Sequence, residues 1–173
     1  MRFNKISLII FAVCSISLLS YAKERDKVEF IVFLVEEKEG YGKNDPILIK
    51  FKLENKGKES VFVNKRFYIN SNKSPEDERD IYFSVTSPDG KEMDYRQDPF
   101  DTGLPRTDDF AYLKPGEQVE SKYDRNLRAY FEFQSPGEYE VRAVYQNQFG
   151  DEIGLDTFQK RLTSNTIKVK ITN

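Results

Sequence analysis

Apolar residues recur at every second position through most of the chain, and this period of two limits the possible folds more than any other feature. The clearest case is Ile47, Ile49, Phe51 and Leu53, because the positions that alternate with them are mostly charged. Successive side chains of a strand point to opposite faces. The segment therefore predicts a strand with one buried and one solvated face. Similar alternation recurs at residues 81–85, 139–145 and 167–171, and an interrupted extended stretch over residues 61–69 and a strand over residues 118–123 are also predicted.

The first predicted strand, residues 28–35, differs from the others because it is apolar on both faces. Val28, Phe30 and Val32 alternate with Ile31 and Phe33. Such a run is typical of a strand that is covered on each side. We therefore expect both faces of this strand to be covered.

Turn signals separate the predicted strands. Ser87-Pro88-Asp89-Gly90 has proline and glycine at the second and fourth positions of a turn. Residues 91–95 suggest a short edge strand, and residues 124–133 a helical turn or a loop that plugs the bottom of the core. The chain has no long amphipathic helix pattern and no internal repeat. These features predict an all-β fold, an immunoglobulin-like antiparallel β-sandwich of about seven to eight strands, with a closed barrel as the alternative.

The N-terminus has the three-part pattern of a secretory signal peptide. Arg2 and Lys5 precede an apolar run over residues 6–19, and Ser20-Tyr21-Ala22 follows it. We expect cleavage between Ala22 and Lys23, so residues 1–22 are a signal peptide and residues 23–173 a single β-sandwich domain. The predicted location is secreted or periplasmic.

Two alternatives compete for this segment. A membrane anchor needs ~20 apolar residues, which this run does not reach, so no membrane span is expected after signal removal. A bacterial lipoprotein signal would place a lipid on Cys14. However, Val13 is not the small residue that such signals require, and the apolar run continues past the cysteine.

The residue types that are missing exclude several kinds of chemistry. The chain has no histidine and no tryptophan, and its one cysteine, Cys14, lies in the signal segment. A Ser-His-Asp system and zinc sites of the Cys/His kind are therefore excluded, and no cofactor is predicted. Removing Arg2 and Lys5 leaves 25 Lys+Arg against 29 Asp+Glu, a net charge of −4. This balance argues against nucleic acid or an anionic membrane as a partner.

The longest irregular stretch, residues 96–109, holds most of the candidate binding residues. Its carboxylates do not show the spacing that would identify a glycosidase pair, and it lacks the alternating aspartates of the well-known calcium loop. Aromatic residues on loops can form a binding patch. The candidate binding set is Asp98, Phe100, Asp101, Arg106 and Tyr112.

Tyr139 is predicted to be a structural corner. In immunoglobulin-like folds a tyrosine two residues before an inner-face position of the sixth strand bonds back to the chain. Val141 occupies that inner-face position here. A plain core tyrosine is the alternative interpretation of Tyr139.

Several motifs, in their order along the chain, resemble those of one kind of exported sandwich. They are Leu53-Glu54-Asn55 with Gly57, Val61 through Phe67, Asp89-Gly90, Leu113-Lys114-Pro115-Gly116-Glu117, Pro136 through Val141, and Leu162 through Thr166. The order is similar to that in the non-catalytic β-sandwich domain attached to deuterolysin-type zinc endopeptidases, and in stand-alone exported bacterial proteins. Peptidase activity is not implied, because the required His-Glu-x-x-His helix is absent. The resemblance implies an accessory, binding or inhibitory domain.

The sequence therefore favours an exported, non-enzymatic domain that binds a protein or envelope component through loops or an exposed strand edge. A carbohydrate-binding module of the envelope is the alternative. A carboxylate-dependent hydrolase is the least favoured function.

Overall fold

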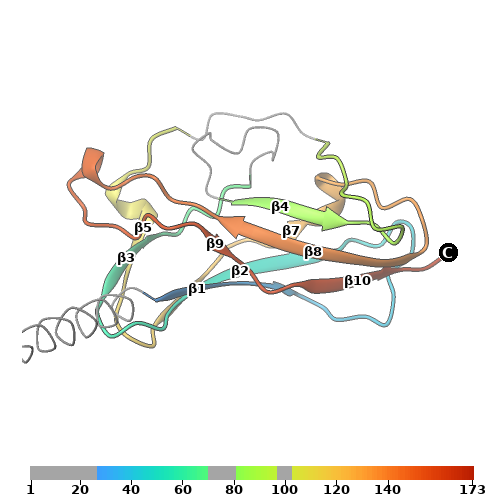
Figure 1. Cartoon of the computed structure of the whole chain (residues 1–173), viewed down its shortest axis with the longest axis horizontal. Coiled ribbons are helices and arrows are strands. Elements are labelled where there is room, and N and C mark those ends of the chain that lie inside the picture. Colours follow the sequence, from blue (N-terminus) through green and yellow to red (C-terminus); the bar gives the residue numbers. More distant parts are fainter. Residues whose placement is uncertain (1–26, 70–80, 97–102) are drawn as a thin grey trace, which may run out of the picture.

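The computed structural model describes residues 27–69, 81–96 and 103–173, and in these ranges the chain is built from β-strands. Figure 1 shows β4 and β8 in one layer and β1 and β2 in the other. Three short 3-10 turns, η1 (Thr107–Asp109), η2 (Leu127–Ala129) and η3 (Asp151–Ile153), lie between strands. The strands are β1 (Val28–Leu34), β2 (Leu48–Asn55), β3 (Val61–Asn64), β4 (Ile81–Thr86), β5 (Phe110–Leu113), β6 (Gln118–Glu120), β7 (Arg125–Asn126), β8 (Gly137–Tyr145), β9 (Leu162–Thr163) and β10 (Ile167–Ile171).

The strands form two main antiparallel sheets, which confirms the predicted all-β sandwich. One sheet has the order β1-β2-β6, with β7 also paired to β2. The other has the order β10-β8-β4, with β9 also paired to β8, and β3 and β5 form a separate pair. The chain crosses between the two sheets as the A-B-E and C-F-G strands of immunoglobulin-like domains do. The described strands do not close into one barrel.

The core lies between the inner faces that the alternation predicted. Ile49, Phe51 and Leu53 of β2 are fully buried, and Phe51 stacks on Phe30 with ring centroids 5.8 Å apart. Phe83 of β4 contacts Phe51 from the opposite sheet at 5.8 Å. Aromatic pairs at this separation add to the stability gained from burial.

Residues 124–133 plug one end of the core, as the sequence predicted. The segment forms β7 and η2, and its Leu127 and Phe131 are fully buried. Phe131 meets Phe83 and Tyr95 edge-on, with ring centroids 6.1 Å and 5.2 Å away. The plug therefore closes the space between the sheets with aromatic rings.

Three elements differ from the expectations. Residues 91–95 form an isolated bridge at Glu92 rather than a strand. The stretch predicted over residues 61–69 stops at Asn64, because Phe67 adopts a left-handed φ of 50° that buries its ring against Phe51. The outer face of β1 is only partly covered by the described residues, since Ile31 and Phe33 stay partly exposed. This last difference determines where the candidate site lies.

Candidate functional site

Five of the residues singled out from the sequence, Ala22, Lys23, Asp98, Phe100 and Asp101, lie outside the described ranges. The other two candidate binding residues lie on one segment around β5. Arg106 is exposed just before η1, where its backbone N–H donates to the Asp109 carboxylate at 2.8 Å. Tyr112 is 54% exposed on β5, and its ring lies 4.8 Å from that of Phe62 on β3.

Tyr139 bonds back to the chain four residues upstream. Its hydroxyl donates to the Ser135 carbonyl at 2.9 Å and accepts from the Ser135 N–H at 3.2 Å. The ring is buried and packs edge-on against Phe133, with centroids 4.9 Å apart. The side chain therefore fixes the entry of the chain into β8, which is the structural role of a tyrosine corner.

The edge of β1 that faces away from β2 lies beside β9 and β10 of the other sheet, and the described residues hydrogen-bond to only part of it. Val35 N–H donates to the Leu48 carbonyl at 2.9 Å, which fixes the odd-numbered residues of β1 as those that bond to β2. Phe30, Val32 and Leu34 therefore turn their backbone N–H and C=O groups away from the sheet. Among the described residues, the backbone groups of Phe30 and Leu34 on this edge have no hydrogen-bond partner.

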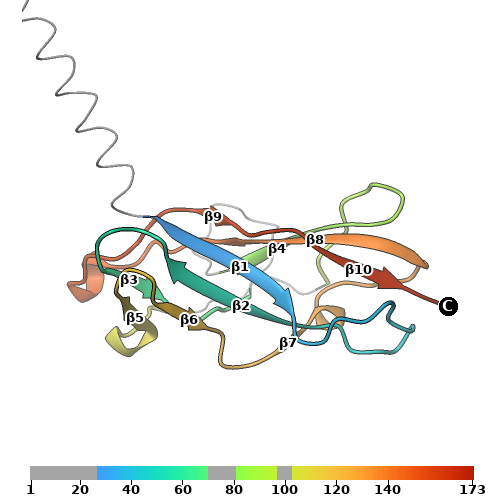
Figure 2. The ribbon, with the colours of Figure 1, turned by 90° about the horizontal axis from the view of Figure 1, so that it is seen from below.

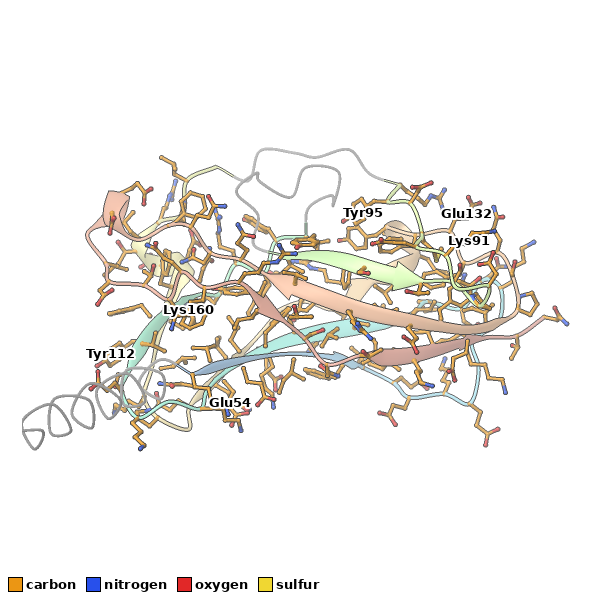
Figure 3. The ribbon with its side chains drawn as sticks, viewed as in Figure 1. Glu54, Lys91, Tyr95, Tyr112, Glu132 and Lys160 are labelled. Atoms are coloured by element: carbon orange, nitrogen blue, oxygen red, sulfur yellow. The ribbon has the colours of Figure 1, made fainter. Side chains whose placement is uncertain are left out.

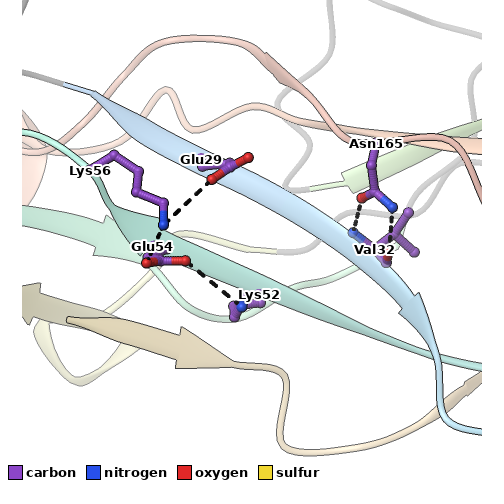
Figure 4. Close-up of polar contacts among 6 residues, drawn as sticks. All are labelled: Glu29, Val32, Lys52, Glu54, Lys56 and Asn165. Carbon is purple, nitrogen blue, oxygen red and sulfur yellow. Dashed lines mark hydrogen bonds and ion pairs between the residues drawn. The ribbon is translucent and has the colours of Figure 1, made fainter. Parts of the chain in front are cut away.

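Asn165 closes this edge at one point. Its side-chain amide donates to the Val32 carbonyl and accepts from the Val32 N–H, both at 3.0 Å, as Figure 4 shows. The amide therefore imitates one residue of a neighbouring strand. Asn165 reaches β1 because the pairing of β8 shifts by one residue between β9 and β10, which forms a bulge that redirects the side chain.

A second contact joins the two sheets further along the same edge. Tyr41 N–H donates to the Lys170 carbonyl at 2.8 Å, and Thr172 N–H donates to the Tyr41 carbonyl at 2.9 Å. Tyr41 thus pairs in parallel with Ile171 and covers the C-terminal half of the edge of β10. The stretch between the Asn165 and Tyr41 contacts remains open.

A groove of about 450 Å³ occupies that open stretch. Figure 2 shows β1 and β10 next to each other at the seam where the groove lies. We call it the seam groove. Its lining is formed by residues 31–34, Glu37, Lys38 and residues 165–168.

The outer face of β1 beside the seam groove is apolar along most of its length. Ile31 and Phe33 are partly exposed, and Val35 is 43% exposed. At the other end of the strand, Glu54 pairs with Lys56 and Lys52, and Lys56 also pairs with Glu29 at 3.9 Å (Figure 4). The hydrogen bond from Lys56 lowers the pKa of Glu54, so this end stays charged. The apolar stripe therefore has a defined charged boundary.

The sequence indicated one part of this site, β1, but gave no indication of the other, Asn165. The two-sided apolar pattern of residues 28–35 marked β1 as a strand that needs cover on its outer face. Nothing in the sequence marked Asn165, which lies in the motif from Leu162 to Thr166, as a residue that contacts β1. Its role depends on a bulge, and a bulge is not visible in the alternation.

The described residues contain no group of three or more histidine, cysteine, aspartate or glutamate side chains that could hold a metal ion. Within the same ranges, no helix is long and apolar enough to cross a membrane. No protein-family model and no curated protein matches the chain. The resemblance to the sandwich domain of deuterolysin-type endopeptidases therefore stays a prediction.

Proposed function

We propose that the protein is an exported, non-enzymatic binding module that takes an extended segment of a partner protein along the open edge of β1. The observation that carries the proposal is the combination of free edge groups on Phe30 and Leu34 with the seam groove beside them. A strand added to an exposed sheet edge gains main-chain hydrogen bonds, and neighbouring pockets select its side chains.

The chemistry of the edge defines the occupant. The occupant must present an extended backbone, because the outward-facing backbone groups of β1 recur at every second residue. Alternate side chains of such a segment would lie over Ile31 and Phe33, so apolar residues at every second position fit best. An accessory or peptidase-inhibiting role is compatible with this mode, since either role requires capture of a polypeptide segment.

Because only the even-numbered residues of β1 turn their backbone amides away from β2, hydrogen exchange gives a direct test. Peptides are first selected against the purified protein from a random displayed library, and exchange is then measured with and without them. We expect the amides of Phe30 and Leu34 to slow by at least about tenfold, because they gain partners on binding. The outward amides of Gln118 and Glu120, on the opposite edge of the same sheet, serve as the internal control. Protection at those amides instead of β1 would overturn the proposal.

A pair of substitutions tests the apolar stripe. Phe33→Ser should weaken peptide binding by about tenfold, because it removes a large apolar contact from the groove. Tyr123→Ser removes an aromatic side chain that is 57% exposed outside the groove and should leave binding unchanged. Equal effects of both substitutions would mean that the peptides bind by general hydrophobicity.

The alternative function, carbohydrate binding, has one observation in its favour. The ring of Tyr112 is exposed and lies tilted against Phe62, and such a ring can pack against a sugar face. A glycan array tests it: binding that is lost in Tyr112→Ala and kept in Phe33→Ser would favour a saccharide ligand over a peptide.

A further inference from the structure

We propose that a cleft at the plugged end of the sandwich binds an organic anion that carries two or more carboxylates. The cleft has a volume of about 470 Å³, and we call it the basic cleft. Figure 3 places its Glu132 at the opposite end of the molecule from Tyr112. Its polar lining residues are Lys43, Asn44, Arg96, Arg128, Glu132 and Gln134.

Three separate segments supply the cations of the basic cleft. Lys43 lies in the loop before β2, Arg96 follows the turn region after β4, and Arg128 belongs to η2. No carboxylate in residues 27–69, 81–96 or 103–173 forms an ion pair with any of the three. The chain as a whole carries a net charge of −2, so a cleft lined by three cations and one carboxylate, Glu132, differs in sign from the molecule as a whole.

Arg128 is held in place by neutral groups. Its Nε donates to the Asp45 carbonyl at 2.7 Å, and its Nη2 donates to the Gly42 carbonyl at 2.8 Å. The guanidinium also lies 5.6 Å from the ring centroid of Phe133. These contacts fix the guanidinium but use two of its five N–H donors. The remaining donors are available to a ligand.

The surroundings of Arg128 only partly offset its charge. The Asp45 carboxylate, which accepts from the Gly42 N–H at 2.9 Å, attracts the guanidinium electrostatically and opposes the effect of burial on its pKa, but forms no ion pair with it. Burial lowers the pKa of Arg128, because the side chain has lost water without gaining a carboxylate in direct contact. A preoriented, partly desolvated guanidinium is a strong site for a planar carboxylate, which it can bind with two parallel hydrogen bonds.

The size and charge of the cleft indicate the class of ligand. Its volume lies within the range of small-molecule sites, so a single inorganic ion would fill little of it. The three cations and Glu132 leave an excess of two positive charges. Two carboxylates on one organic molecule would balance this excess and could reach more than one of the three segments.

A titration of the ¹⁵N-labelled protein followed by NMR tests the proposal. The probes are succinate and a triglutamate peptide, with inorganic phosphate as comparison, all at constant ionic strength with chloride. We expect saturable shifts of the backbone amides of residues 43–45 and 131–134 and of the Arg128 Nε–H. Binding by either carboxylate probe supports the proposal, and the tighter one identifies whether the carboxylates come from a small acid or a peptide.

Variants inside and outside the basic cleft distinguish binding at a specific site from a general effect of charge. Arg96→Gln and Lys43→Gln change exposed side chains and should each weaken succinate or triglutamate binding by about tenfold, the loss expected for one charge-assisted hydrogen bond. Lys122→Gln removes an exposed charge outside the cleft and should have no effect. Equal binding of phosphate, shifts that do not saturate, or equal affinity in all variants would each overturn the proposal.

Discussion

The Tyr139 hydroxyl is a small group with a measurable structural role. It both donates to and accepts from the backbone of Ser135, so removing it leaves two main-chain groups to find other partners. We predict that Tyr139→Phe lowers the free energy of unfolding by about 1–2 kcal/mol, the usual cost of losing such bonds. Urea denaturation measures the loss, and Tyr123→Phe, which removes a hydroxyl from an exposed ring, is the control. A loss in the control as large as that in Tyr139→Phe would contradict the corner role.

The pKa of the Asp89 carboxyl gives a second prediction. Hydrogen bonds from Lys91 and Ser87 lower the pKa of Asp89 from 3.8 to about 2. A carboxyl with a lowered pKa in the folded state contributes stability above its unfolded pKa, and this contribution is lost as the pH falls through the folded value. We expect the Asp89 carboxyl to titrate near pH 2 in a ¹³C NMR experiment. Lys91→Gln should move that midpoint up towards 3.8, whereas Lys122→Gln should not move it.

Asn55 shows why a sequence motif can be read correctly as a turn while its main role stays hidden. Asn55-Lys56-Gly57-Lys58 has the composition of a turn, and Asn55 accepts from the Gly57 N–H at 2.9 Å as expected of such a residue. The same side chain is fully buried and donates to the carbonyls of Glu59 and Leu113. The bond to Leu113 spans two distant parts of the chain, and local pattern gives no information about it.

At the scale of elements, the Asn165 contact between β10 and β1 can be opened by one substitution. Asn165→Ala removes both hydrogen bonds to Val32, so we predict faster amide exchange at Val32 and a loss of about 1 kcal/mol in unfolding free energy. Asn165→Asp keeps the acceptor but cannot donate to the Val32 carbonyl, and it should be no more stable than Asn165→Ala. An unchanged exchange rate at Val32 would contradict the contact.

The Asn165→Ala substitution also tests the proposed function. If a partner segment pairs with β1, it competes with Asn165 for the backbone of Val32. Asn165→Ala should then bind selected peptides more tightly than the natural sequence, although the protein itself is less stable. Weaker binding would mean that Asn165 forms part of the binding surface.

Strands with clean alternation were predictable, and those that depend on partners were not. The pattern of β2 and β8 reflects one buried face, so burial and sequence agree along their whole length. The strand predicted over residues 167–171 is β10, but β9 and the bulge between β9 and β10 were not predicted, and residues 91–95 form only a bridge at Glu92. These outcomes depend on which strands become neighbours, and neighbours are set by the whole fold.

For the whole molecule, the sequence predicted the architecture better than the site. Alternation and turn signals determine how many faces must be buried, and a sandwich satisfies that requirement. The candidate residues were sought on the long loop, whereas the open groups of the described structure lie on β1. An edge strand is defined by the absence of a neighbour, and the only sign of this in the sequence of β1 is the pair of partly exposed apolar residues on its outer face, Ile31 and Phe33.

The shifted carboxylates, lysines and tyrosines of the described residues share one trend, from which only the lowered pKa of Arg128 departs among the shifted groups described. Hydrogen bonds lower the pKa of shifted carboxylates and raise that of shifted lysines, and burial raises the pKa of shifted tyrosines. All of these shifts move titration away from neutrality. The carboxylates are Glu54, Asp89 and Glu152, the lysines are Lys56, Lys91 and Lys168, and the tyrosines are Tyr41, Tyr95 and Tyr130.

The direction of these shifts predicts a flat dependence of stability on pH. Lowered carboxyl values lose their contribution only at acid pH, and raised lysine and tyrosine values only above about pH 10. With no histidine in the chain, nothing with an ordinary pKa between about 5.5 and 9 remains except the terminal amine and, before signal removal, Cys14. The unfolding free energy from urea titrations at constant ionic strength should therefore vary by less than about 10% across this window, the uncertainty of the extrapolation. A clear transition near pH 6 would contradict this prediction, because it would require a carboxyl group whose pKa is strongly raised in the folded protein.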